Sequence, residues 1–385
     1  MGDKNFRVRK WTTALVALMI CLPACNRTSQ PDQTTSSTQP NQTGSSATQL
    51  PPAQNSFADL VSRVAPAVVT VHSARRIRPP RQHPFFDDPR FRDFFGNRRI
   101  PESELPRQQG LGSGVIVSGE GYILTNQHVV DGAEEINVEL NDKRSYAARL
   151  IGSDPASDLA VLKVDQRNLP VLPMGDSDRA RVGDVVLAIG SPLGLDQTVT
   201  AGIISAKGRS TGLSDGSFED FLQTDASINQ GNSGGALINA TGELIGINSQ
   251  ILSPTGGNIG IGFAIPVNMA KNVMDQLVQN GRVRRGSLGI TIRPVTPDIA
   301  ARMGLQDVRG ALVNSVGNGS PAERAGLKPG DVITEFNGAP VTDTNSLRNA
   351  VAGSQPGTEV TLTIVRERQR QELRATLVEL NANRR

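Results

Sequence analysis

Gly231-Asn232-Ser233-Gly234-Gly235 is a run of small residues around one hydroxyl group, and the apolar residues 236–238 follow it directly. Glycines allow backbone N–H groups to approach a substrate closely. Such a loop can present the Oγ of Ser233 and direct the amides of Gly231 and Ser233 at a developing oxyanion. The same composition is also typical of an ordinary turn between strands. The functional interpretation therefore depends on residues elsewhere in the chain.

Two upstream segments favour that interpretation. His128 lies in the run LTNQHVV, and Asp158 lies in SDLAVLKV. His, Asp and Ser in this order form one of the known chain orders of hydrolytic triads. We expect His128 to take the proton of Ser233 as its Oγ attacks a peptide carbonyl, while Asp158 orients the imidazole ring.

Other residues compete for these roles. His128 could instead be a hydrogen-bonded core histidine, and Asp154 or Asp225 could replace Asp158. Asp158 is preferred because it directly precedes an apolar, strand-like run. The three histidines are scattered and no cysteine cluster accompanies them, so we expect no metal site and no cofactor.

Length and charge limit the class of protein. A chain of 385 residues is long enough for two or three domains, each with its own core. The formal net charge is +3, but four basic residues and one acidic residue lie within the first 24 positions, so the remainder is nearly neutral. A nucleic acid as main partner would require a basic surface, and we expect none.

The N-terminus predicts export. Residues 1–24 read as a signal peptide, with basic residues before an apolar run that is short for a membrane span. Leu22-Pro23-Ala24-Cys25 resembles a bacterial lipobox, which predicts lipidation of Cys25; ordinary cleavage or an uncleaved anchor are the alternatives. Because both cysteines lie here, the folded part contains no disulfide. Residues 25–56 are rich in Ser, Thr, Gln and Pro and predict a disordered tether.

Short β-type runs separated by Gly, Asp, Asn and Pro dominate the region after Phe57, which favours barrels or sandwiches. Residues 267–280 form the first convincing helix, because their apolar positions follow a helical period. The predicted strands include 135–140, 146–151, 159–164, 185–189, 199–205, 236–238, 244–247 and 259–265 and, nearer the C-terminus, 359–365 and 372–380.

A long loop at 77–109 interrupts the first strands. It contains five of the chain's 11 phenylalanines within eleven residues, interleaved with arginines. Loops of this length are usually functional. We expect a lid or a contact between subunits, since exposed aromatic clusters mark interaction sites; a locally packed surface loop is the alternative.

A second domain follows residue 286. The run AERAGLKPGDVI at 322–333, followed by Asn337-Gly338, resembles a PDZ domain. Leu288-Gly289-Ile290 matches the loop by which PDZ domains bind a peptide C-terminus through backbone amides and apolar side chains. The expected ligands are therefore C-terminal peptides.

Together, TNxHVV, SDLAVLKV and GNSGGAL, followed by one PDZ-like region, resemble the HtrA/Deg family of trypsin-like serine endoproteases. The resemblance implies a mainly β fold. A trypsin-like domain at 57–281 would consist of two six-stranded antiparallel β-barrels, with His128 and Asp158 on the first and Ser233 on the second. An α+β PDZ domain at 282–381 would follow. It also implies ATP-independent, stress-related quality-control proteolysis of misfolded polypeptides in the periplasm, usually by a homotrimer. The lipobox-like N-terminus separately predicts that this chain is attached to a membrane.

The resemblance extends to specificity and regulation. Ser227 stands where trypsin-like enzymes that cut after Lys or Arg carry an acid, and Ile228 and Ile251 would line the substrate pocket. These residues predict cleavage after small aliphatic residues, because an unpaired buried cation is costly. Residues 206–217 match a sensor loop in the family, and their composition is typical of a mobile loop. We expect Arg209 to be its regulatory contact, with its guanidinium bound to backbone carbonyls of a neighbouring loop; a solvated surface charge is the alternative. A peptide-binding chaperone or scaffold is the alternative function.

Overall fold

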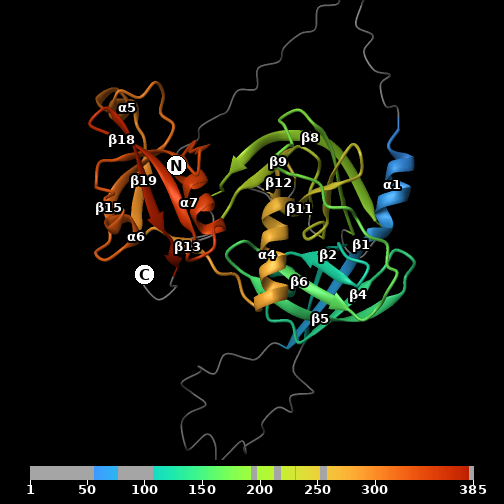
Figure 1. Cartoon of the computed structure of the whole chain (residues 1–385). Coiled ribbons are helices and arrows are strands. Elements are labelled where there is room, and N and C mark those ends of the chain that lie inside the picture. The colour runs from blue at the N-terminus through green and yellow to red at the C-terminus, as the bar shows by residue number, and fades with distance from the viewer. Residues whose placement is uncertain are drawn as a thin grey trace, which may run out of the picture. The chain divides into compact units, whose positions relative to one another are not determined.

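The computed structural model describes residues 56–76, 107–191, 197–211, 218–229, 231–251 and 258–380 (Figure 1). The expected signal peptide, Cys25, nearly all of the tether and most of the loop 77–109 lie outside these residues. Within the described ranges, no helix combines the length and apolar character needed to cross a bilayer.

The first barrel is closed and entirely antiparallel, with strand order β1-β2-β3-β6-β5-β4. Helix α1 (Ala58–Val64) and a 3-10 turn (Ala65–Ala67) precede it, and the short helix α3 (Gln127–Val130) follows β3. Its strands are β1 (Val68–Arg76), β2 (Arg107–Ile116), β3 (Tyr122–Thr125), β4 (Glu135–Glu139), β5 (Ser145–Asp154) and β6 (Leu159–Val164).

The second barrel repeats this plan with strand order β10-β11-β12-β9-β8-β7. Its strands are β7 (Val185–Gly190), β8 (Thr198–Arg209), β9 (Phe221–Thr224), β10 (Ala236–Asn239), β11 (Leu244–Ile251) and β12 (Gly262–Pro266). Helix α4 (Val267–Asn280) leaves β12 and packs against β5 and β6 of the first barrel and β11 of the second. The expected pair of six-stranded antiparallel barrels is therefore confirmed.

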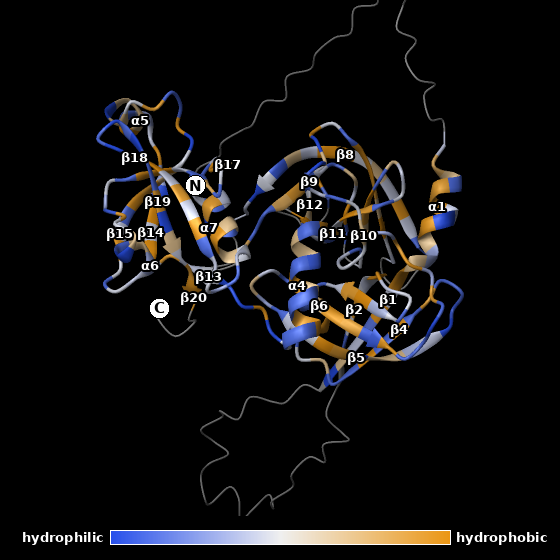
Figure 2. Cartoon of the chain, viewed as in Figure 1, coloured by the Kyte–Doolittle hydropathy of each residue, from blue (hydrophilic) through white to orange (hydrophobic). Residues whose placement is uncertain are grey.

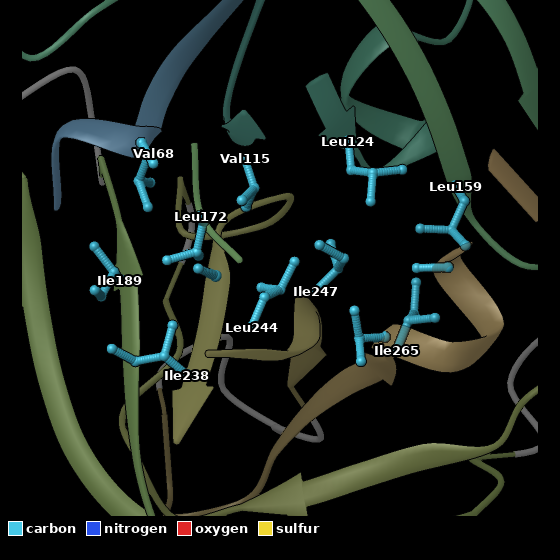
Figure 3. Packing of buried hydrophobic residues seen from close by; sticks show 14 of the residues in the cluster. Val68, Val115, Leu124, Leu159, Leu172, Ile189, Ile238, Leu244, Ile247 and Ile265 are labelled. Atoms are coloured by element: carbon cyan, nitrogen blue, oxygen red, sulfur yellow. The ribbon is translucent and has the colours of Figure 1, made fainter. Parts of the chain in front are cut away.

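A shared apolar core joins the two barrels. Val115, Leu124 and Leu159 of the first barrel belong to one buried cluster with Ile189 and Ile247 of the second (Figure 3). Strand β6 is almost wholly buried, and Figure 2 shows it as largely hydrophobic. Burial of a side chain of this size contributes about 1.5 to 3 kcal/mol, so this cluster holds the barrels together.

The C-terminal domain has its own core beneath an antiparallel sheet of order β14-β15-β16-β18-β19, with β17 paired to β16 and β13 paired to β20. The carboxylate of Asp331, buried within it, accepts two hydrogen bonds of 2.7 Å from Arg366. The elements are β13 (Gly286–Ser287), β14 (Ile290–Pro294), α5 (Pro297–Met303), β15 (Ala311–Val316), α6 (Pro321–Arg324), β16 (Val332–Phe336), β17 (Ala339–Pro340), α7 (Thr344–Gly353), β18 (Glu359–Arg366), β19 (Gln369–Thr376) and β20 (Val378–Glu379).

Four predicted boundaries were wrong. The loop expected to end at residue 109 ends earlier, because β2 begins at Arg107 and pairs with β1. The strand expected at 259–265 begins at Gly262, where pairing with β9 and β11 starts. The segment 372–380 divides into β19 and β20, with buried Leu377 between them. Residues 206–209, expected in a mobile loop, belong to β8.

The carboxyl group of Asp220 lies near Asp178, Lys207 and Asp343, the N-cap of α7. Burial, with the charges of Asp178 and Asp343, raises the pKa of Asp220 from its ordinary 3.8 to about 6, and Lys207 opposes the rise. Lys207 donates its Nζ protons to three backbone carbonyls, including that of Ala180 at 2.7 Å. The positive charge of Lys207 therefore offsets the negative charge of Asp220 only in part.

We predict that Asp220→Asn stabilises the protein at neutral pH. Because the folded state binds this proton more tightly than the unfolded state does, Asp220 lowers stability as pH rises from about 4 through 6. Asn removes this charge and should raise the free energy of unfolding near pH 7 by on the order of 1–3 kcal/mol. Thermal midpoints measured across this pH range test the effect, with Asp298→Asn at an exposed carboxyl as control. A pH-independent difference between wild type and Asp220→Asn would contradict the prediction.

Candidate active site

The structure brings His128 and Asp158 together. The Nδ1 atom of His128 lies 2.9 Å from both carboxylate oxygens of Asp158, and its backbone N–H donates to Oδ1 at 3.1 Å. A carboxylate only accepts hydrogen bonds, so the proton of the neutral imidazole lies on Nδ1. Nε2 is then the free basic nitrogen. The side chain of His128 is 49% exposed, which leaves it accessible to a substrate.

Asp158 adopts an unusual backbone conformation that fixes this geometry. Its φ is +55°, in the left-handed region. Its carbonyl accepts from the Nδ2 of buried Asn126 at 2.9 Å and from the N–H of Gln127 at 3.1 Å. Non-glycine residues with positive φ persist only where surrounding contacts hold them, and they gather at functional sites. The same bonds tie the loop of Asp158 to the start of α3, which carries His128.

Ser233 reaches this pair through Ser249 on β11. The hydroxyl of Ser233 donates to the carbonyl of Ser249 at 2.8 Å, and the hydroxyl of Ser249 donates to Oδ2 of Asp158 at 3.0 Å. Among the described residues, Ser233 and His128 share no direct hydrogen bond. Ser249 is a residue that the sequence reasoning missed. The available signal was the polar run Asn248-Ser249-Gln250 inside the otherwise apolar strand 244–251.

The loop before Ser233 leaves two amides available. Gly231 and Gly234 have φ values of +99° and +84°. The N–H groups of Asn232 and Gly234 donate to Asn229 and Asn248, whereas those of Gly231 and Ser233 have no partner among the described residues. Two unpaired N–H groups beside a serine hydroxyl can bind an oxyanion.

The competing carboxylates are engaged elsewhere. Asp154 accepts from the guanidinium of Arg285 at 2.9 Å and from the hydroxyl of Ser157. Asp225 accepts from the backbone N–H of Ile203 at 2.8 Å, on the second barrel. The structure pairs neither of them with His128, so Asp158 is the carboxylate that contacts the ring.

Ile228 and Ile251 contact the same apolar cluster in the second barrel, but they are buried to different extents. Ile228 is only 1% exposed, and Ile251 packs against the cluster from its edge. A Cβ on Gly262 would lie 2.9 Å from the Cδ1 of Ile228, so the glycine allows the side chain of Ile228 to pack against the backbone of β12.

Leu288, Gly289 and Ile290 line one side of a cavity of about 450 Å³ in the C-terminal domain, and Leu347 and Val351 of α7 line the other. Gly289 has a φ of +72°, and a Cβ there would lie 2.6 Å from the Cβ of Ser320, so glycine is required. The cavity is an apolar groove between β14 and a helix.

Arg209 ends β8 and donates its Nε to the side chain of Gln223 at 3.2 Å. It therefore contacts the next strand of the same barrel in this structure, rather than the carbonyls of a neighbouring loop.

Both folded parts of the chain match known protein families. Residues 112–247 match the family model of the trypsin-like peptidase domain, and residues 286–377 match that of the PDZ domain. A probable periplasmic serine endoprotease, DegP-like, from Chlamydia muridarum is 46% identical over 341 residues, covering 85% of this chain and 68% of the relative. The periplasmic pH-dependent serine endoprotease DegQ of Escherichia coli is 46% identical over 324 residues, covering 84% and 70%.

Among solved structures, the HtrA-type protease AlgW with a decapeptide superposes with a TM-score of 0.65 at 47% identity, covering 85% of this chain and 99% of that one. The chain therefore belongs to the HtrA-type, DegP-like family of serine endoproteases, and it is a serine endopeptidase with a PDZ domain.

Proposed function

We propose that Ser233, His128 and Asp158 form the catalytic triad, with the amides of Gly231 and Ser233 as the oxyanion hole. The observation that carries this proposal is the continuous chain of contacts from His128 to Asp158, Ser249 and Ser233. These contacts support the proposal because they link a hydroxyl of the second barrel and an imidazole of the first barrel through one carboxylate.

The chemistry follows from these positions. The hydroxyl proton of Ser233 passes to Nε2 of His128 while Oγ bonds to the carbonyl carbon of the substrate. The carbonyl oxygen becomes an oxyanion and accepts from the two free amides. The imidazolium, stabilised by Asp158, then gives its proton to the leaving amine as the C–N bond breaks. Water attacks the acyl-enzyme by the same route and restores Ser233.

The hydroxyl of Ser233 must turn before it reacts. It donates to the carbonyl of Ser249 in this structure, so the first step exchanges that acceptor for Nε2 of His128. Ser249 can hold the hydroxyl until a substrate approaches, and its own hydroxyl keeps the carboxylate of Asp158 in position throughout.

We predict that Ser233→Ala removes essentially all proteolysis. Loss of the nucleophile lowers kcat by about 10⁶-fold in related serine proteases. The rate at which purified protein digests casein measures this loss. Ser62→Ala, at a surface serine of α1, is the control and should keep full activity. Casein digestion by Ser233→Ala would show that the proposed nucleophile is wrong.

The cellular setting proposed here is the periplasm, where the DegP-like relatives are described to act. Unfolded or misfolded polypeptides are the proposed substrates, because an exposed triad accepts extended chains. Assembly as a homotrimer, attachment to a membrane through lipidated Cys25 and a role in stress response remain predictions from the sequence.

Specificity for small aliphatic residues rests on Ser227, Ile228 and Ile251. A lysine side chain would meet the buried Ile228, and none of these three described residues carries a carboxylate to pair its charge. An unpaired buried charge is costly.

We predict that a peptide with Val before the cleaved bond has a kcat/KM on the order of 100-fold above its Lys counterpart. Paired reporter peptides that differ only at this residue provide the measurement. Ser227→Asp should narrow the ratio by supplying a negative charge to the Lys peptide. Equal kcat/KM values for the two peptides with wild-type protein would exclude the proposed pocket.

The PDZ groove is proposed to bind the C-terminus of a peptide, with the carboxylate at the backbone of residues 288–290 and the last side chain against Leu347 and Val351. The same groove is the site that the alternative function, a peptide-binding chaperone, would use.

Regulation of proteolysis through Arg209 stays a prediction, since Arg209 contacts Gln223 in the structure.

We predict that a peptide with a free apolar C-terminus binds this groove at least about 10-fold more tightly than the same peptide with a C-terminal amide. The carboxylate accepts from backbone amides, and amidation removes the charge that they bind. Calorimetry on Ser233→Ala protein avoids cleavage during the titration. Equal affinities for the acid and the amide would place peptide binding elsewhere.

A further inference from the structure

Ser113 is a fully buried serine on β2 of the first barrel, and it contacts the oxyanion loop of the second. Its backbone N–H donates to the carbonyl of Ser233 at 2.8 Å, and its hydroxyl donates to the carbonyl of Gly231 at 2.7 Å. One residue therefore binds both carbonyls that flank Asn232. These are the carbonyls of the two residues whose amides would hold the oxyanion.

Ser113 is itself fixed on both sides. Its Oγ accepts from the backbone N–H of Ser191 at 2.8 Å, and its carbonyl accepts from the hydroxyl of Thr125 at 2.7 Å. The hydroxyl has one proton, and the amide of Ser191 occupies an acceptor position. The proton is consequently directed at Gly231. Few other orientations are open to this side chain.

Glycines allow the close approach that these bonds require. A Cβ on Gly112 would lie 3.2 Å from the carbonyl oxygen of Ser233, and a Cβ on Gly234 would overlap the carbonyl oxygen of Ser113. The backbone of β2 and that of the oxyanion loop are therefore in direct contact. A side-chain hydroxyl as short as that of serine spans the remaining distance.

Gly231 needs such a restraint. With a φ of +99° it occupies a region open to glycine, where backbone freedom is greatest. Rotation about its ψ would swing its carbonyl and change the direction of the peptide units around it. The bond from Ser113 fixes that carbonyl, and the second bond fixes the carbonyl of Ser233. The amide of Ser233 thus lies between the two anchored carbonyls, and the amide of Gly231 belongs to the residue whose carbonyl is the first of them.

We propose that Ser113 is a positioning residue that holds the oxyanion loop in its productive arrangement through its hydroxyl. The inference rests on the proposed triad and oxyanion hole. Ser113 touches no reacting atom and acts through Gly231 and Ser233. Its effect belongs to the transition state, because the amides bind the developing oxyanion more strongly than the carbonyl of the bound substrate.

The experiment compares Ser113→Ala with wild type using a Val reporter peptide and a peptide boronic acid. Boron bonds to the Oγ of the nucleophile and becomes tetrahedral, with an oxygen in the oxyanion position. We expect kcat to fall about 10- to 100-fold with KM within about twofold. Affinity for the boronic acid should fall by the same factor as kcat/KM. Affinity of the uncleaved Val peptide, measured in a Ser233→Ala background, should not change.

Ser177→Ala is the matched control. Ser177 is 1% exposed, and its hydroxyl accepts from the backbone N–H of Asn268 in α4 at 3.2 Å. It should lower the thermal midpoint while kcat and boronic acid affinity stay at wild-type values. Ser113→Cys keeps the shape with a weaker donor, and it should give an intermediate loss of both quantities. It carries the test alone if Ser113→Ala does not fold.

Two results would overturn the proposal. One is a Ser113 variant that loses thermal stability but keeps kcat and boronic acid affinity within about twofold of wild type. The other is a fall in kcat with unchanged boronic acid affinity, which would place the effect outside the oxyanion hole. Failure of the triad is separate, since it would appear as residual proteolysis by Ser233→Ala.

Discussion

The bond from Ser249 to Asp158 is the interaction on which the proposed site depends, because it joins the two barrels at the carboxylate that contacts His128. Asp158 and His128 come from the first barrel, whereas Ser249 and Ser233 come from the second. Neither barrel contains a complete site. The buried apolar cluster shared by the barrels supplies the attraction, but hydrophobic contact is non-directional and cannot set a register at ångström precision. Hydrogen bonds across the boundary provide that register.

A second set of hydrogen bonds between the barrels lies at the loop of Ser233 itself. Ser113 of β2 binds the carbonyls of Gly231 and Ser233, while Ser249 of β11 accepts the hydroxyl of Ser233. Ser233, the proposed nucleophile, is thus restrained from both barrels at once. Small residues are needed at these crossings because backbones approach within contact distance, as the space at Gly112 and Gly234 demonstrates. The glycine-rich composition of both segments follows from this approach.

Much of the fold was predictable from the sequence because its signals are local. The helix 267–280 and the strand 159–164 coincide with α4 and β6, since a helical period and an apolar run are read within one segment. The short helix α1 escaped prediction, because its seven residues are stabilised by packing of Leu60 and Val64 into a distant core. For the site, His128, Asp158 and Ser233 carry reactive groups in a known order. Ser249 and Ser113 carry ordinary hydroxyls, whose importance lies only in what they contact across the barrel boundary.

A ring contact and hydrogen bonds also connect the PDZ groove with the segment that precedes Asp158. Phe218 lines the groove beside Leu288, and its ring lies 4.5 Å from the guanidinium of Arg285. Arg285 is the partner of buried Asp154, and the backbone N–H of Phe218 donates to the carbonyl of Ala156 at 2.7 Å.

The next residue along the chain, Glu219, extends this connection to α7. Its carbonyl accepts from the side chains of Asn345 and Asn349, each at 2.7 Å. A peptide that displaces Phe218 must therefore change the surroundings of a buried ion pair four residues before Asp158. Coupling between two equilibria is reciprocal, so an arrangement of that loop that raises the affinity for the peptide is itself stabilised, by the same free energy, when the peptide binds.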